Sequence, residues 1–160
     1  MNNGDNKLKT AKETVEDFLQ KLDDFINETN CQFSTFKPEF MTAANMSMDQ
    51  LKALAKDDCF NNADLLYGYA SYINDQYTRQ KVVYDLCTDQ IEKMVAKNNN
   101  TFSPYTKHEA KMQLIIVDNE YARSIDHYRQ VANARMQTMY DKIYELKRKA
   151  DILTEKGKRL

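Results

Sequence analysis

One apolar stripe along the last third of the chain constrains the fold more than any other feature. From Ala110 to Leu153, apolar residues recur at a mean spacing close to 3.6. They are Ala110, Leu114, Val117, Tyr121, Ile125, Tyr128, Ala132, Met136, Met139, Ile143, Leu146, Ala150 and Leu153. This is the α-helical repeat, and it predicts one helix of about fifty residues that begins at Ser103-Pro104 and meets no breaker before Gly157.

Turn-forming residues are scarce, with three glycines and two prolines in 160 residues. Sandwiches and barrels need many such residues at their turns, so an all-β fold is excluded. The chain also has no glycine-rich loop, which excludes a P-loop and a dinucleotide-binding fingerprint. The sequence therefore predicts an all-α protein that hydrolyses no nucleotide by itself.

Three further helices are predicted before the long stripe. Thr10 and Glu13 fit a capping box that opens an acidic amphipathic helix ending near residues 27–30. Ser47 and Gln50 form a second box and open a short helix over 48–57. After a break at 57–62, helical spacing resumes over 63–97.

These elements predict a long antiparallel helical hairpin with an N-terminal amphipathic helix and a C-terminal oligomerising helix. Residues 1–45 form a first region, the acidic helix plus a Phe-rich loop, and residues 46–160 form the helical core. Phe33, Phe36 and Phe40 lie in that loop around Pro38. Two interpretations are open, because three phenylalanines need cover: they pack on the protein's own core, or they dock a partner.

The length of the last helix predicts self-association. Fifty helical residues would span roughly 75 Å, whereas a compact monomer of this size is about 30 Å across. A partner helix of about 35 residues would leave the C-terminal heptad seam bare. We therefore expect a homo-oligomer held by Met136, Met139, Ile143, Leu146, Ala150 and Leu153.

Charge is unevenly distributed along a nearly neutral chain. Residues 1–60 carry 7 basic and 11 acidic groups, whereas residues 129–160 carry 9 basic and 4 acidic groups. Such an asymmetry favours a polyanionic partner. In the C-terminal cluster, from Lys147 to Arg159, two interpretations are equally weighted: the cations complement the helix dipole, or they contact phosphates.

Basic residues follow one stripe beside a tyrosine-rich face. On a helical wheel Arg79, Lys93 and Lys97 fall within one arc, away from Asp85, Asp89 and Glu92, and Lys107 and Lys111 follow across a short turn. Cations for phosphates beside ring faces for bases are what single-stranded nucleic acid needs. We predict that these five basic residues bind nucleic acid, although a solvated helix flank explains the same pattern.

Catalytic and membrane functions have little basis in the sequence. His108 and His127 lie in no metal-binding motif, and no serine, threonine or cysteine lies in a nucleophile context. Three widely spaced cysteines indicate reduced thiols, and no apolar run or leader-like segment indicates a membrane span or secretion. We expect no enzymatic activity, no cofactor, no metal and no membrane partner.

Several short motifs resemble those of the UvsY-type recombination mediators of T-even-like bacteriophages, over about residues 50–155. The run from Tyr105 through Lys107 and Glu109 to Lys111, followed by Leu114, resembles the family's Tyr-x-Lys-x-Glu-x-Lys-x-x-Leu stretch. Shorter matches are Tyr72-Ile73-Asn74, Lys56-Asp57 with Phe60, and Arg148 with Ile152. The family's basic Leu-Lys-Ala-Arg-Leu segment aligns with residues 94–98, where only Lys97 keeps a charge.

The resemblance implies a function in DNA recombination and repair. Members are small, helical, ring-forming proteins of the infected bacterial host's cytoplasm that bind single-stranded DNA. They help a RecA-type recombinase to load onto DNA coated by single-strand-binding protein, so these two proteins are the implied partners. The alternative is a non-enzymatic coiled-coil scaffold that binds no nucleic acid.

Overall fold

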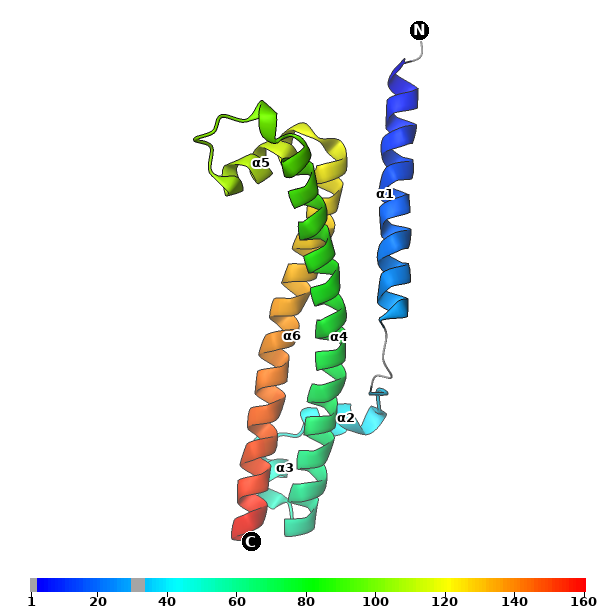
Figure 1. The fold of residues 1–160 in the computed structure, drawn as a ribbon. Helices are drawn as coiled ribbons and strands as arrows, with labels where there is room; N and C mark the ends of the chain where they lie inside the picture. Colours follow the sequence, from blue (N-terminus) through cyan, green and yellow to red (C-terminus); the bar gives the residue numbers. More distant parts are fainter. Residues whose placement is uncertain (1–2, 30–33) are drawn as a thin grey trace. The chain divides into compact units, whose positions relative to one another are not determined.

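The computed structural model describes residues 3–29 and 34–160, with side chains from Thr14 onwards, and is shown in Figure 1. Its helices are α1 (Asn3–Glu28), α2 (Pro38–Ala44), α3 (Met48–Ala53), α4 (Lys56–Lys97), the 3-10 turn η1 (Asn99–Thr101), α5 (His108–Asp118) and α6 (Glu120–Arg159). No strand occurs within those two ranges. The all-α class is therefore confirmed.

The helices belong to two units. Unit 1 contains α1, the part of α4 from Arg79, α5, and the part of α6 up to Ala134. Unit 2 contains α2, α3, the part of α4 up to Thr78, and the part of α6 from Arg135. α2 and α3, on either side of residue 45, lie in the same unit.

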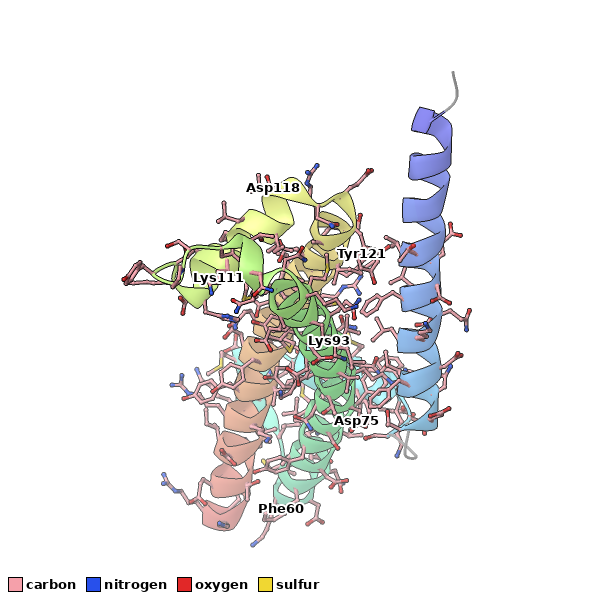
Figure 2. The ribbon with its side chains drawn as sticks, turned by 45° about the horizontal axis from the view of Figure 1, so that its top comes forward. Phe60, Asp75, Lys93, Lys111, Asp118 and Tyr121 are labelled. Atoms are coloured by element: carbon pink, nitrogen blue, oxygen red, sulfur yellow. The ribbon has the colours of Figure 1, made fainter. Side chains whose placement is uncertain are left out.

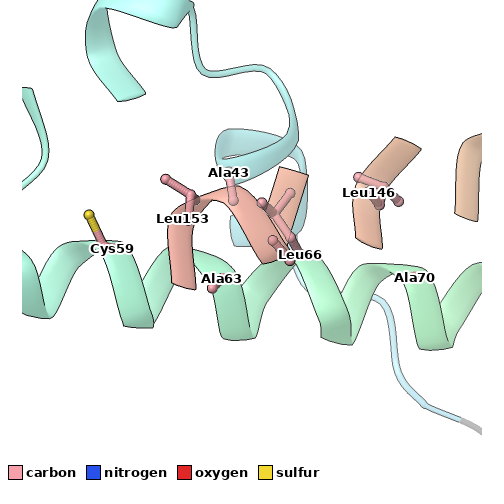
Figure 3. Packing of buried hydrophobic residues seen from close by; sticks show 8 residues of the cluster. Ala43, Cys59, Ala63, Leu66, Ala70, Leu146 and Leu153 are labelled. Carbon is pink, nitrogen blue, oxygen red and sulfur yellow. The ribbon is translucent and has the colours of Figure 1, made fainter. Parts of the chain in front are cut away.

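The core of unit 2 joins the first half of α4 to the second half of α6. Its buried side chains come from α2, α4 and α6 and are Ala43, Cys59, Ala63, Leu66, Ala70, Leu146, Ala150 and Leu153, most of them labelled in Figure 3. The two helices run antiparallel, because Tyr67 donates a hydrogen bond of 2.5 Å to Asp151 while Gly157 lies against the ring of Phe60. Small residues between the leucines let the two helices approach closely.

This core corrects the expectation about the C-terminal seam. Met136, Leu146, Ala150 and Leu153 are buried, and Met139 and Ile143 are half-buried. The last four of the six predicted interface residues pack within unit 2. The premise that the partner helix is too short to cover this seam is wrong, because α4 has 42 residues and its first half packs against the end of α6, which has 40.

Aromatic side chains hold α2 on α4 in unit 2. The Phe40 ring is buried and stacks on Tyr69 with centroids 5.6 Å apart. Phe36 packs edge-on against Phe40 at 6.1 Å and lies 5.5 Å from Tyr72. For Phe40 the core interpretation is confirmed, while Phe33 lies outside the described residues. The predicted loop is wrong over 38–44, where Pro38 occupies the first turn of α2.

Two lysines of α6 bind the ends of the short helices. Lys149 Nζ donates to the carbonyl oxygens of Ala44 at 2.6 Å and Met46 at 3.2 Å, at the end of α2. Lys156 Nζ does the same at the end of α3. At its other end α3 has the predicted capping box, in which Gln50 N–H donates to Ser47 Oγ and Ser47 N–H donates to Gln50 Oε1.

Unit 1 has its own core, formed by the second half of α4, α5 and the first half of α6. The buried side chains are Cys87, Ile91, Ile116 and Ile125, and Phe18 of α1 packs against them. Gln90 Nε2 donates to the Tyr121 hydroxyl at 3.1 Å, which ties α4 to α6. The helix α1 begins at Asn3, so the predicted start at Thr10 is wrong.

The predicted fifty-residue helix is two helices. α5 begins at His108, after Lys107, rather than at Ser103-Pro104. A break at Asn119 separates it from α6, and the Asn119 side chain accepts a hydrogen bond of 3.0 Å from the Ala122 N–H. Asparagine in this position satisfies an otherwise unpaired amide at the start of a helix. The predicted break at 57–62 is also wrong, because α4 is helical from Lys56.

Candidate nucleic-acid interface

The end of α4, the η1 turn and the start of α5 form one exposed surface of unit 1. One contact joins α5 to η1, and a second joins the start of α5 to α4. Lys111 Nζ donates to Asn99 Oδ1 at 2.8 Å, and His108 Nε2 lies 4.0 Å from Glu92 Oε1. We call this surface the α4–α5 turn surface and define it by Lys93, Lys97, Phe102, Tyr105, Lys107 and Lys111. Lys93 and Lys111 are labelled in Figure 2.

The four lysines of this surface differ in their contacts. Lys97 and Lys107 are exposed, and neither makes an ion pair with any residue for which the structure gives side chains. Lys93 is bound to Asp89 at 2.6 Å, one helical turn earlier. The placement of Asp89 away from the basic arc is therefore wrong, since residues four apart share a helix face. Lys97, Lys107 and Lys111 remain as the cations best placed for phosphates.

Aromatic rings accompany these cations. Tyr105 is 94% exposed, the most exposed of the large hydrophobic side chains that the structure describes. Phe102 is half-buried, and the Lys111 ammonium lies 5.8 Å from its ring centroid, within cation–π range. A ring as exposed as that of Tyr105 can stack on an unpaired base, and lysines of the same surface can bind the phosphates of the strand.

The start of α5 adds a partial positive charge to the same place. Lys107 precedes the first turn with extended backbone, and its side chain makes no capping hydrogen bond. The first amides of a helix carry a partial positive charge that attracts anions. Glu109 in the first turn opposes this field. The net field therefore depends on the lysines rather than on the helix end alone.

Arg79 does not belong to this surface. It lies on α4, 18 residues before Lys97, which corresponds to about 27 Å along a helix axis. The side chain is half-buried and already interacts with other residues. Its binding to nucleic acid stays a prediction separate from the turn surface.

Two cations of the basic C-terminal cluster stabilise the fold of unit 2. Lys149 and Lys156 bind backbone carbonyls of α2 and α3, and Lys158 pairs with Glu155 at 2.7 Å. Lys149 and Lys156 thus complement the C-terminal ends of α2 and α3, which neither interpretation of the cluster considered. Lys147, Arg148 and Arg159 are exposed.

Two buried polar side chains of unit 1, Asp126 and Cys87, do not form a reactive centre. Asp126 is buried, and it accepts hydrogen bonds from Arg129 at 2.9 Å and Gln130 at 2.6 Å. Burial raises the pKa of the nearby Cys87 thiol to about 11, which keeps it protonated. Across the described side chains, no three histidine, cysteine or acidic residues gather as a metal site.

Two residues of the surface were not predicted as site residues. Phe102 and Tyr105 fall between two helical patterns, in the segment NNNTFSPY. The sequence does hold one indication of their role. An aromatic residue that lies outside the apolar repeat of a helix has no helix face on which it can be buried, so it is expected at the surface. Tyr105 was named only as part of the motif that resembles the mediator family. Nothing in the sequence indicated that Asn99 would accept a hydrogen bond from Lys111.

Comparisons with known proteins give no family assignment: no family model, curated protein or solved structure matches the chain. Among the described helices, none combines the length and the apolar character needed to cross a membrane.

Proposed function

We propose that the chain binds single-stranded DNA through the α4–α5 turn surface and acts as a recombination mediator. In this function it assists a RecA-type recombinase in loading onto DNA coated by single-strand-binding protein. The observation that carries the proposal is the bare ring of Tyr105, two residues before the exposed Lys107 in the segment that leads into α5. Both residues also belong to the stretch that resembles the mediator family.

The expected binding mode follows from the composition of the surface. Four lysines neutralise few phosphates, so one chain binds weakly and with a strong dependence on salt. Stacking of one base on Tyr105 contributes about 1–3 kcal/mol and needs no particular sequence. Weak, sequence-tolerant contacts suit a mediator, because it must release the strand to the recombinase.

Replacing Tyr105 with alanine tests this mode directly. We expect the Tyr105→Ala variant to bind a fluorescent oligo-dT at least fivefold more weakly, given the stacking energy. Tyr140→Ala is the matched control, because Tyr140 is an exposed tyrosine of unit 2. Equal losses in the two variants, or none in either, would refute a site at Tyr105.

The mediator step has its own assay. A RecA-type recombinase hydrolyses ATP when it assembles on single-stranded DNA, and prior coating by single-strand-binding protein delays assembly. We expect the wild-type chain to shorten this delay and the Tyr105→Ala variant to shorten it less. If the wild-type chain binds DNA but does not change the delay, it is a DNA-binding protein and not a mediator.

The second candidate is a scaffold that binds no nucleic acid. The pairing of Lys93 with Asp89 and the presence of Glu109 at the start of α5 favour it, because both reduce the positive field. Under this alternative the lysines of the α4–α5 turn surface only interact with water and bind no partner. Failure to bind oligo-dT at low salt would support it.

A further inference from the structure

A groove in unit 2 between α3 and α6 has an apolar floor that no described residue of its unit covers. It has a volume of about 410 Å³, and its floor includes Met48 and Leu51 of α3 with Ile152 and Leu153 of α6. Met48 is 68% exposed and Ile152 is 59% exposed. Single exposed apolar residues are common, but here two of them face one groove from two helices.

The rim of this α3–α6 groove is basic. Lys52, Arg148, Lys149 and Lys156 line it, against one acidic residue, Glu145. Lys149 and Lys156 are fixed by hydrogen bonds to backbone carbonyls, which keeps their charge in place. Lys52 lies 3.9 Å from Asp49, a long and exposed pair that neutralises little of the field.

The α3 wall of the groove is held at both ends. Its first turn carries the Ser47–Gln50 capping box, and its last carbonyls accept from Lys156. A groove with fixed walls loses little conformational entropy when a ligand enters. An amphipathic helix is the usual occupant of such a groove, with side chains at i, i+3, i+4 and i+7 entering it.

Two other occupants fit less well. A nucleic acid strand would need rings on which to stack, and none of the lining residues is aromatic. A second copy of this chain seated through the same groove would place the basic end of α6, with its cluster from Lys147 to Arg159, against an equally basic rim. Like charges across an interface oppose association.

We propose that the α3–α6 groove docks an acidic amphipathic helix of a partner protein. Its apolar face contacts Met48 and Ile152, and its carboxylates face Lys52 and Arg148. This surface lies in unit 2 and is independent of the proposed DNA-binding surface of unit 1. It gives the chain a separate contact for a protein.

The test uses a synthetic helix as the probe. A fluorescein-labelled peptide of about 18 residues, with leucine at i, i+3, i+4 and i+7 and glutamate at most other positions, is titrated with the full chain. A matched peptide carries glutamine in place of every glutamate. We expect the acidic peptide to bind at least tenfold more tightly than the glutamine peptide.

Variants locate the binding site. Ile152→Glu introduces a like charge on the floor and should weaken binding of the acidic peptide at least tenfold. Tyr144→Glu is the control, because Tyr144 lies on the same helix, is 65% exposed and does not line the groove. It should bind within about twofold of wild type. Arg148→Gln tests the rim without adding a charge to the floor and should weaken binding severalfold.

Four outcomes would overturn the proposal. The acidic peptide fails to bind, or it binds the Ile152→Glu variant as tightly as wild type. Excess oligo-dT displaces it, which would place it on the basic surface of unit 1. Light scattering shows a wild-type dimer that Ile152→Glu converts to a monomer, which would make the groove a self-association site.

Discussion

Lys156 Nζ on α6 lies 2.8 Å from the carbonyl oxygen of Leu51 on α3, although the two residues are 105 positions apart in the sequence. The same ammonium donates to the carbonyls of Lys52 at 2.7 Å and Leu54 at 2.9 Å. All three donors of one lysine are therefore used at the end of one short helix. A positive charge there also complements the negative end of the helix dipole.

Removing this ammonium should destabilise unit 2. We expect Lys156→Met, which keeps the side-chain length, to lower the free energy of unfolding by about 2 kcal/mol. Urea denaturation followed by circular dichroism measures the change. Lys158→Met removes an exposed lysine two residues further along α6 whose partner is Glu155, and it should lower the free energy of unfolding far less, because an exposed ion pair is screened by water. Equal effects would contradict the role given to Lys156.

Two helical glycines give a paired prediction. A Cβ at Gly68 would lie 3.0 Å from Cε1 of Phe40, and a Cβ at Gly157 would lie 3.0 Å from Cζ of Phe60. Alanine gains about 1 kcal/mol of helix propensity at either site. Phe40 is buried among other rings and cannot move away, so Gly68→Ala should lower the melting temperature.

The Phe60 ring is exposed and free to shift, so Gly157→Ala should leave the melting temperature unchanged or raise it. Differential scanning calorimetry of the two variants measures both changes. A drop for Gly157→Ala as large as that for Gly68→Ala would contradict the distinction between a buried and an exposed ring.

Cys87 should resist alkylation in the folded protein. Burial raises its pKa from 9.0 to about 11, which lowers the thiolate fraction at pH 8 about a hundredfold. We expect iodoacetamide to leave Cys87 unmodified in the native chain and to modify it in denaturant, as read by mass spectrometry of peptides. Rapid native modification would show that the unit 1 core is not packed as described.

The same pKa shift has a consequence for stability. The unfolded chain loses the thiol proton near pH 9, before the folded chain does. The contribution of Cys87 to the free energy of unfolding is therefore complete below pH 9 and is lost as the pH rises through about 11.

The long helices were predictable because their apolar residues repeat with the helical period. The break at Asn119 was missed because Val117 and Tyr121 keep this period across it. α2 was missed because Pro38 was interpreted as a loop residue, whereas proline also fits the first turn of a helix. Asn119 and Pro38 both mark the start of a helix. The spacing of apolar residues gives no information about where a helix starts.

The tertiary roles of the C-terminal lysines could not be predicted. The carbonyls that Lys149 and Lys156 bind belong to residues more than a hundred positions earlier, so no local pattern links them. The self-association prediction was based on the length of one helix. α4 begins seven residues earlier than predicted, and these residues extend it along the end of α6. The length of the last helix is therefore no longer a reason to expect self-association.

The central claim is that Lys107 and Lys111 contact phosphates of a single strand, and a salt titration tests it most directly. The logarithm of the oligo-dT binding constant is measured against the logarithm of salt concentration for wild type, Lys107→Ala/Lys111→Ala and Lys147→Ala/Arg148→Ala. We expect a slope smaller by about 1.4 in magnitude for the first double variant, since each phosphate contact contributes about 0.7. We expect no change for the second. A slope that is the same for all three proteins, or that falls only in the second variant, would contradict the claim.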